Sequence, residues 1–470
     1  METNQSFNIL ERFNQWLKES ITVKLMSIGF LILILLIPTV WIQDLMEERQ
    51  ERAESVIAEV SEKWSGNQTI SGPILIIPYR HQETIFIDGD KNKIEIRETI
   101  RKAFFLPESL EIKGNITPEI RKRGIFEAVV YKSTLTSKTL FQKPDFTKLE
   151  IASDLVLWKD ASLAIAISDL RGISDDPKIT VGTQKFYAEP IQDIGISTRR
   201  FKKEIIKGNA SEYDIFSQNG IIIPLNWESE SSFEGNSLIV FELKGSERLS
   251  FVPSGKTTLV NLNGPWTNPS FDGEFLPAEH DITETDFSAQ WKVLNFNRPF
   301  AQQWKGEGTK LTGSEFGLNL LIPVDQYQKS IRTSKYGLLI ILLTFIALFL
   351  VEITQKIRIH PFQYILIGVA LIIYYTLIIS FSEQTGYDVA YWISTFATVS
   401  LISLYSITFF RNKRLVLLFS ALLLIFYSFI FIIILQQDFS LLIGSIGLFI
   451  IVAALMYFSR KVNWYKEARG

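Results

Sequence analysis

Long apolar stretches lie near both ends of the chain, and a strand-like alternation of apolar and polar positions fills the middle. The first stretch, residues 25–42, carries Ser27 and Thr39 as its only polar side chains. A helix needs about 20 apolar residues to cross the ~30 Å hydrocarbon core of a bilayer, so this stretch predicts a transmembrane helix over residues 25–43. Its length and the long segment before it favour a retained anchor over a cleaved signal peptide.

Five further apolar stretches follow late in the chain and predict a five-span bundle over residues 336–458. They cover residues 336–353, 361–381, 389–410, 415–435 and 439–458. The connections between them are short, so successive helices are expected to be antiparallel neighbours. The fold class that we predict is therefore a membrane protein with six spans, one N-terminal and five C-terminal.

Basic residues gather in alternate loops of this predicted bundle. Lys and Arg follow the second, fourth and sixth spans, whereas the loops at 382–388 and 436–438 contain neither. Because cytoplasmic loops carry an excess of Lys and Arg, we expect both termini to be cytoplasmic and residues of about 44–335 to be extracytoplasmic. Lys329, Arg332 and Lys335 argue against this orientation, but they follow a long segment that translocates as a domain.

The region between the first and second spans predicts a large β domain. Residues 1–24 are expected to form a cytoplasmic amphipathic segment, residues 44–68 a stalk helix and residues 459–470 a cytoplasmic tail. Across 69–335, period-two runs such as Ile239, Phe241 and Leu243 alternate with turn residues. Many short strands without long helical patterns favour a mainly antiparallel, sandwich-like domain, built as one sheet system or as two subdomains.

Two similar segments raise the hypothesis that this β domain is duplicated. Phe105-Leu106-Pro107 is followed by Phe126-Glu127-Ala128, and Phe275-Leu276-Pro277 is followed by Phe287-Ser288-Ala289. Each pair leads into a predicted strand, as repeated supersecondary units do.

The composition narrows the classes of function. The 470 residues contain 48 Lys and Arg against 50 Asp and Glu, which disfavours nucleic-acid binding by the whole chain. The chain has three His and no Cys, which excludes disulfides and leaves little material for a metal centre. It also lacks a phosphate-binding loop, a dinucleotide fingerprint and the common hydrolase motifs. We therefore expect no enzymatic activity, no cofactor and no metal.

Three acidic residues form a candidate functional rim. Glu383, Asp388 and Asp438 fall in the loops that are predicted to lie outside the cytoplasm. Together they can bind a cation or contact the β domain. The basic residues of the opposite loops already predict acids at these positions, so a structural interpretation is also open.

Two further polar residues lie at the predicted membrane boundary. Glu352 is near the end of its span, and a buried charge in a membrane is a functional hypothesis by default. An interfacial ion pair with the nearby Lys356, Arg358 or His360 is the simpler explanation, and we favour it. His360 can act as a proton-sensitive switch, or it can lie in an aqueous loop before Pro361, which would open the next helix.

Hydroxyl side chains are frequent in the fourth predicted span. They can form hydrogen bonds between helices or line a polar path, and we favour the first interpretation because no charged residue accompanies them. The residues are Ser394, Thr395, Thr398, Ser400, Ser403, Ser406 and Thr408.

The order of several motifs resembles that of the CreD family of bacterial inner membrane proteins over nearly the whole chain. The matching segments include Phe105-Leu106-Pro107, Asp169-Leu170-Arg171-Gly172, Phe271-Asp272-Gly273-Glu274, Ile359-His360-Pro361-Phe362 and Arg460-Lys461-Val462-Asn463-Trp464-Tyr465. The resemblance implies a role in cell envelope integrity, no agreed enzymatic activity, and a periplasmic location for residues 44–335.

Two functions are therefore expected, one of them preferred. The preferred one is a protein of the bacterial inner membrane whose periplasmic β domain binds an envelope protein, lipid or glycan. The alternative is a transporter or flippase subunit for a lipid or envelope precursor, either alone or as a homo-oligomer. The small bundle and the lack of a charge pair buried in the membrane weigh against the alternative. A hydrolase or transferase acting on envelope polymers has the least support.

Overall fold

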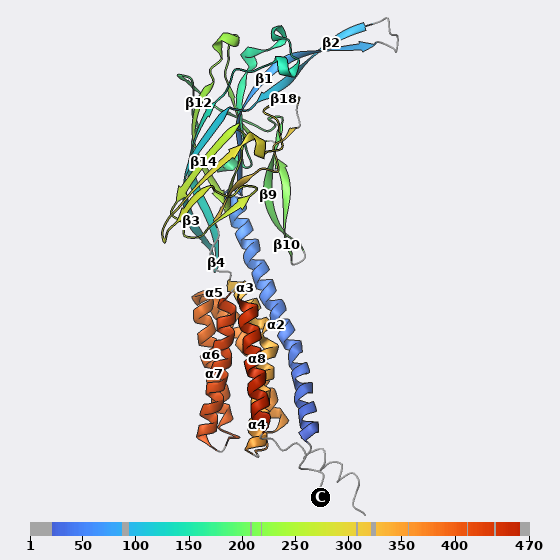
Figure 1. The fold of residues 1–470 in the computed structure, drawn as a ribbon, viewed down its shortest axis with the longest axis vertical. Coiled ribbons are helices and arrows are strands. Elements are labelled where there is room, and N and C mark those ends of the chain that lie inside the picture. The colour runs from blue at the N-terminus through green and yellow to red at the C-terminus, as the bar shows by residue number, and fades with distance from the viewer. Residues whose placement is uncertain are drawn as a thin grey trace, which may run out of the picture. The chain divides into compact units, whose positions relative to one another are not determined.

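The computed structural model describes residues 21–86, 94–206, 209–217, 219–306, 309–320, 326–355, 357–410, 412–436 and 439–460. The chain forms two compact units. The helical unit combines Met1–Arg52 with Val324–Gly470, and the β unit comprises Ala53–Pro323. Figure 1 shows one unit made of helices and one made mainly of strands. Residues 1–20 and 461–470, which hold most of the predicted amphipathic segment and tail, lie outside the described residues.

All six predicted spans are helical. Five helices are long and apolar enough to cross a membrane in the described part of the chain, namely α2, α4, α5, α6 and α7. The sixth, α8, contains a shorter apolar stretch, Leu442–Ala454, so its crossing stays a prediction. The helices are α2 (Ile21–Trp64), α3 (Gln326–Lys335), α4 (Gly337–Thr354), α5 (Pro361–Thr385), α6 (Tyr387–Ser406), α7 (Lys413–Leu435) and α8 (Ser440–Ser459).

Helix α3 differs from the prediction, which placed its residues in the β domain of 69–335. Gln326–Lys335 is a helix that groups with the helical unit. It buries Ser330, Thr333 and Ser334, and small polar residues of this kind give no apolar stripe that a sequence pattern can detect.

The N-terminal span is an integral part of the helical unit. Ile28, Leu35, Ile42 and Met46 of α2 belong to the same buried cluster as residues of α4, α5, α6 and α7. Gly368 of α5 permits this approach, because a Cβ atom there would lie 2.3 Å from Cδ1 of Leu35. Small residues commonly allow such close packing between membrane helices.

The β unit contains two large sheets and one small sheet. The nine-stranded sheet has the order β15-β20-β13-β1-β5-β11-β8, with β2 beside β1 and β18 beside β2. Its strands are β1 (Gln68–Phe86), β2 (Ile94–Phe105), β5 (Ser162–Ile167), β8 (Glu189–Ile191), β11 (Gly220–Pro224), β13 (Arg248–Val252), β15 (Pro269–Gly273), β18 (Gln303–Lys305) and β20 (Phe316–Leu320).

The eight-stranded sheet has the order β16-β17-β14-β3-β4-β12-β6-β7. Its strands are β3 (Ser109–Arg123), β4 (Phe126–Leu140), β6 (Lys178–Val181), β7 (Gln184–Phe186), β12 (Asn236–Ser246), β14 (Thr257–Gly264), β16 (Glu279–Ile282) and β17 (Phe287–Leu294). The small sheet joins β9 (Ile196–Ile206), β10 (Asn209–Ser217) and β19 (Thr309–Lys310). Most strand pairs are antiparallel, as predicted. The pairs β1–β13, β3–β14 and β9–β19 are parallel, so each sheet is mixed.

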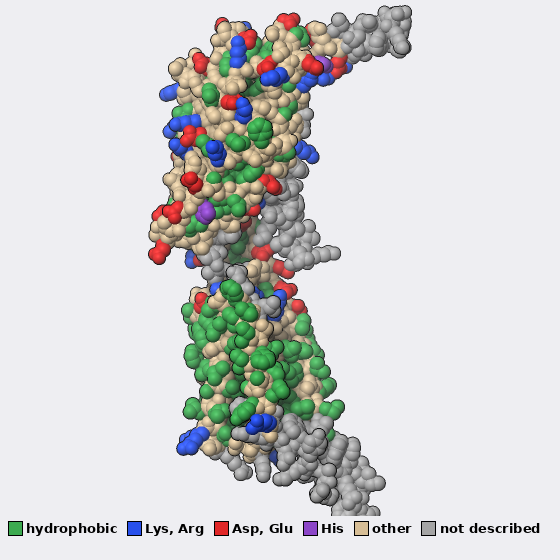
Figure 2. All heavy atoms as spheres, in the orientation of Figure 1, with side chains coloured by type: hydrophobic (Ala, Val, Ile, Leu, Met, Phe, Trp, Pro, Cys, Tyr) green, Lys and Arg blue, Asp and Glu red, His purple; other side chains and the backbone are tan. Residues whose placement is uncertain are grey.

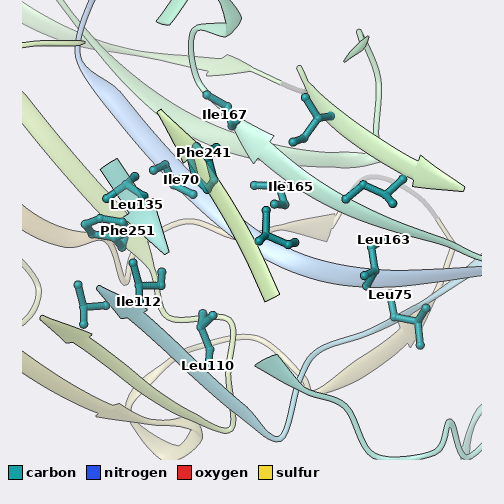
Figure 3. Packing of buried hydrophobic residues seen from close by; sticks show 14 of the residues in the cluster. Ile70, Leu75, Leu110, Ile112, Leu135, Leu163, Ile165, Ile167, Phe241 and Phe251 are labelled. Atoms are coloured by element: carbon teal, nitrogen blue, oxygen red, sulfur yellow. The ribbon is translucent and has the colours of Figure 1, made fainter. Parts of the chain in front are cut away.

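One apolar core joins the two large sheets into a single sandwich. Figure 3 shows Ile70, Ile165 and Phe251 of the nine-stranded sheet meeting Ile112 and Phe241 of the eight-stranded sheet. These side chains are buried and belong to one continuous cluster. Of the two arrangements that the sequence allowed, the described residues form the single sheet system.

The two outer faces of the sandwich differ. The outer face of the nine-stranded sheet carries a second apolar cluster that includes Ile76, Phe104, Ile194 and Leu311. The eight-stranded sheet instead alternates between buried positions and partly or fully exposed ones along β14, β17 and most of β12. Such alternation is typical of a sheet with one face in water, so the outer face of the eight-stranded sheet is open.

The predicted stalk is the last part of α2, which runs without a break from the first span to Trp64. Within the β unit, Glu59 forms ion pairs with Lys63 and Arg123. Their hydrogen bonds lower the pKa of Glu59 to about 2. The guanidinium of Arg121 lies 4.8 Å from the ring centre of Trp64. These contacts fix the end of the helix against strand β3.

The two Phe-Leu-Pro segments occupy comparable places. Each precedes an antiparallel hairpin of the eight-stranded sheet, β3–β4 in one case and β16–β17 in the other. The Phe-x-Ala segments that follow begin the second strand of each hairpin, β4 and β17. The duplication itself stays a prediction.

Candidate functional site

Glu352 is the most deeply buried of the candidate residues, with 3% of its surface exposed. Its carboxylate forms an ion pair with Lys24 of α2. It also accepts a hydrogen bond from the backbone N–H of Ile359 at 2.7 Å and one from the Tyr364 hydroxyl at 3.0 Å. The sequence suggested an ion pair at Glu352, and the described residues include one with Lys24, which is 328 residues away in the chain.

The pair lies at the ends of the two predicted spans. The side chain of Glu352 is 4% exposed and that of Lys24 is 32% exposed. The pair ties α2 to the end of α4 and to the start of α5. Removing either partner would leave a charge that is costly to bury.

His360 lies at the N-terminus of α5. Its Nδ1 accepts a hydrogen bond from the backbone N–H of Phe362 at 3.2 Å. The backbone N–H of His360 donates to the side-chain oxygen of Gln363 at 2.9 Å. Pro361 occupies the first turn of the helix. This reciprocal arrangement caps the helix, and the imidazole is exposed.

The predicted acidic rim lies beside cations from elsewhere in the helical unit. Glu383 accepts a hydrogen bond from the Tyr327 hydroxyl at 3.2 Å and lies 3.8 Å from Arg49. Asp388 lies 3.8 Å from Lys329. Asp438 lies outside the described residues. No group of three or more His, Asp or Glu side chains converges in the described ranges. The cation-binding and structural interpretations of Glu383 and Asp388 both stay predictions.

Lys329 is one of the basic residues that argued against the predicted orientation. It belongs to α3, where its ammonium also lies 5.5 Å from the ring centre of Tyr387. Thr333 of the same helix shares a hydrogen bond of 2.6 Å with the Tyr387 hydroxyl. The basic residues of α3 thus belong to a helix that packs on the start of α6.

The core of the bundle is rich in hydroxyl groups. Among the hydroxyl residues that the sequence analysis named, four residues of α6 are buried: Ser394, Thr395, Thr398 and Ser406. A hydrogen bond of 2.5 Å joins the hydroxyls of Ser403 in α6 and Ser420 in α7. This contact agrees with a role of the hydroxyls in helix packing.

Four tyrosines that the sequence did not single out share this core. They are Tyr374, Tyr375, Tyr391 and Tyr427, and all are fully buried. Tyr391 donates to the carbonyl oxygen of Tyr427 at 2.6 Å. Within the described part of the chain, the hydroxyls of Tyr375, Tyr427, Ser394 and Thr344 have no hydrogen-bond partner.

A groove of about 750 Å³ crosses the open face of the eight-stranded sheet. Strands β16, β17, β14, β3 and β4 contribute to it. Its polar lining residues alternate with core residues such as Leu262 and Ala289, whose side chains are buried. Ten outward polar residues of the groove are Lys113, Asn115, Thr134, Thr136, Asn261, Asn263, Glu279, Asp281, Ser288 and Gln290. The exposed His280 of β16 also lines the groove.

The strand register places these ten residues in two rows that run across the strands. The ladders pair Asn261 with Lys113 and Gln290, and pair Asn263 with Asn115 and Ser288. The first row is Glu279, Gln290, Asn261, Lys113 and Thr136, and the second row is Asp281, Ser288, Asn263, Asn115 and Thr134. We call these ten residues the polar groove.

The sequence contained a signal for the polar groove that its interpretation missed. Asn is unfavourable in strands, yet Asn261 and Asn263 occupy alternate positions of β14. Two such residues on one face of a strand indicate a requirement other than strand stability. The register that brings them beside Asn115, about 150 residues earlier in the chain, depends on the parallel pairing of β3 and β14.

An apolar helical bundle joined to a large folded β unit defines an integral membrane protein with a substantial domain outside the lipid. The comparison with family models gives a match to "Inner membrane protein CreD" over residues 20–465. The chain is also 30% identical to the inner membrane protein CreD of Escherichia coli (strain K12) over 456 residues, which cover 96% of this chain and 95% of that protein. The chain belongs to the CreD family of inner membrane proteins.

Proposed function

We propose that this protein supports the integrity of the cell envelope by binding an envelope component with its β unit. In this proposal the helical unit is the membrane anchor, both termini are cytoplasmic, and the β unit lies in the periplasm. The polar groove carries the proposal, because it combines a volume of about 750 Å³ with ten outward polar side chains on an otherwise regular sheet. The proposed activity is non-enzymatic binding.

The orientation can be tested with cysteines, because the chain has none of its own. Asn236 is exposed at the start of β12, and Lys413 is exposed at the start of α7. In cells with a permeabilised outer membrane, a membrane-impermeant maleimide should label Asn236→Cys and leave Lys413→Cys unlabelled. Labelling of Asn236→Cys only after the inner membrane is broken would overturn the periplasmic assignment.

Binding can be tested by photocrosslinking in intact cells. A photoreactive residue at Asn261, in the middle of the polar groove, is expected to give a discrete adduct. The matched control is Lys292 of β17, which is exposed on the same sheet but does not line the groove. The proposal fails if neither position, or both positions equally, gives an adduct.

The alternative is a subunit of a transporter or flippase for a lipid or envelope precursor. The buried carboxylate of Glu352, which pairs with the partly exposed Lys24, and the hydroxyls of the bundle core favour it. Transport pathways use polar groups inside a membrane bundle. A homo-oligomer could supply a wider path. If Glu352→Gln and Glu383→Gln leave every envelope phenotype of a deletion strain fully complemented, the transport alternative loses its support.

A further inference from the structure

We infer that the ligand of the polar groove is an extended, uncharged polyhydroxylated chain, that is, a glycan strand lying across β16, β17, β14, β3 and β4. The inference rests on the proposed binding function and specifies its ligand. It follows from the shape of the groove, from the hydrogen-bonding capacity of its side chains and from their charges.

The shape of the polar groove suits a linear polymer. Adjacent strands are ~4.8 Å apart and alternate residues along a strand are ~7 Å apart. Five neighbouring strands therefore give two rows about 19 Å long, with a narrow strip between them. The repeat between strands is close to the length of one sugar ring in an extended glycan. Successive rings can thus each meet one pair of polar side chains.

The hydrogen-bonding capacity of the groove suits hydroxyl groups. Asn115, Asn261, Asn263 and Gln290 each present two N–H donors and one carbonyl acceptor. Thr134, Thr136 and Ser288 add hydroxyls that both donate and accept. A sugar hydroxyl also donates and accepts, so both of its functions can be satisfied at once. The short stems of Asn, Thr and Ser lose little conformational entropy when they bind.

The charges of the groove disfavour an anionic ligand. Lys113 is the one basic residue in the two rows, and its ammonium lies 3.1 Å from Glu111. Glu279 and Asp281 place two carboxylates at the β16 edge. Anionic polymers and phosphate headgroups are bound by clusters of Arg and Lys, which these rows lack. An apolar lipid chain would leave the amides without partners, which is unfavourable.

The experiment measures binding of two fluorescent oligosaccharides, an N-acetylglucosamine hexamer and a glucose hexamer with the same β-1,4 linkage, to the full chain in detergent. Binding is expected to at least one of them. Asn261→Val/Asn263→Val should weaken it at least tenfold, and Lys292→Ala should leave it within twofold. Val favours strands more than Asn does, so the loss is not a consequence of unfolding. An unchanged thermal unfolding midpoint of the β unit checks this.

The other outcomes separate the ligand class from the proposed function. If neither sugar binds, or if Lys292→Ala weakens binding as much as the Asn double variant, the glycan inference is wrong. Binding of oligolysine that Glu279→Gln/Asp281→Asn abolishes would identify a site for cationic peptides and overturn the glycan. A protein adduct at Asn261 in the crosslinking experiment would also overturn the glycan as the ligand, but it would support the proposed binding function. The absence of any adduct at Asn261 would overturn both the proposed binding function and the glycan inference.

Discussion

The two units of this protein distribute polar side chains in opposite ways. In the β unit, an apolar core lies between the two large sheets, and the polar rows of the eight-stranded sheet face outward. In the helical unit, large apolar side chains such as Leu404, Leu417 and Phe449 are exposed, whereas four tyrosines and Glu352 are buried. Figure 2 shows the same contrast, with mixed side chains over the β unit and hydrophobic ones over the helices.

The difference reflects the solvent of each unit. In water, burying apolar surface drives folding, at about 25 cal/mol per Å². In lipid the surroundings are as apolar as Leu, so association of helices depends on close packing and on hydrogen bonds between them. A polar side chain therefore has a different meaning in each unit. On the eight-stranded sheet the polar groove faces outward, and in the bundle some buried hydroxyls form hydrogen bonds between helices.

The largest expected effect is a loss of stability on one face of strand β17 that the other face does not share. Trp291 is fully buried, packs against Phe271 and Phe316, and donates to the carbonyl of Phe275 at 3.1 Å. Trp291→Ala is expected to destabilise the β unit by about 3–5 kcal/mol. The neighbouring Gln290→Ala should change its stability by less than about 0.5 kcal/mol. Denaturation followed by the far-UV signal of the strands measures both, and similar losses would contradict the inward and outward assignment.

The sequence predicted the elements of both units because the signals are local. Apolar length identified the helices, and period two identified strands such as 239–243.

The sequence did not reveal which distant residues meet. The pairing of Lys24 with Glu352 and the parallel pairing of Asn263 with Asn115 join positions that are more than a hundred residues apart. No local pattern encodes such contacts, since they depend on the packing of whole elements. The same limitation explains why the sequence did not suggest Lys24 as a partner of Glu352.

The second expected effect concerns the buried ion pair. Glu352→Leu removes the carboxylate and leaves Lys24, the Ile359 N–H and the Tyr364 hydroxyl without their acceptor. Breaking a fully buried pair costs about 3–5 kcal/mol, and the one-third exposure of Lys24 reduces this to about 2 kcal/mol through solvent screening. Unfolding of the purified chain in detergent with increasing SDS measures the loss.

Two controls sharpen this measurement. Lys24→Met/Glu352→Leu removes both charges and should recover much of the stability lost in the single variant. Asp388→Asn, at an exposed pair of the same unit, should have an effect below about 0.5 kcal/mol. If the double variant is as unstable as Glu352→Leu, the ion pair is not the source of the loss.

The smallest effect distinguishes helix packing from a polar path. Tyr391→Phe removes the hydrogen bond from the Tyr391 hydroxyl to the Tyr427 carbonyl. Hydrogen bonds between helices contribute about 0.6 kcal/mol to stability on average in membrane bundles. Tyr427→Phe retains that carbonyl and removes a buried hydroxyl that has no partner among the described residues, so it should be neutral or slightly stabilising. The SDS unfolding assay compares the two. Should Tyr427→Phe instead cost as much as Tyr391→Phe, its hydroxyl must bind something inside the bundle. That result would favour the transport alternative over a purely structural core.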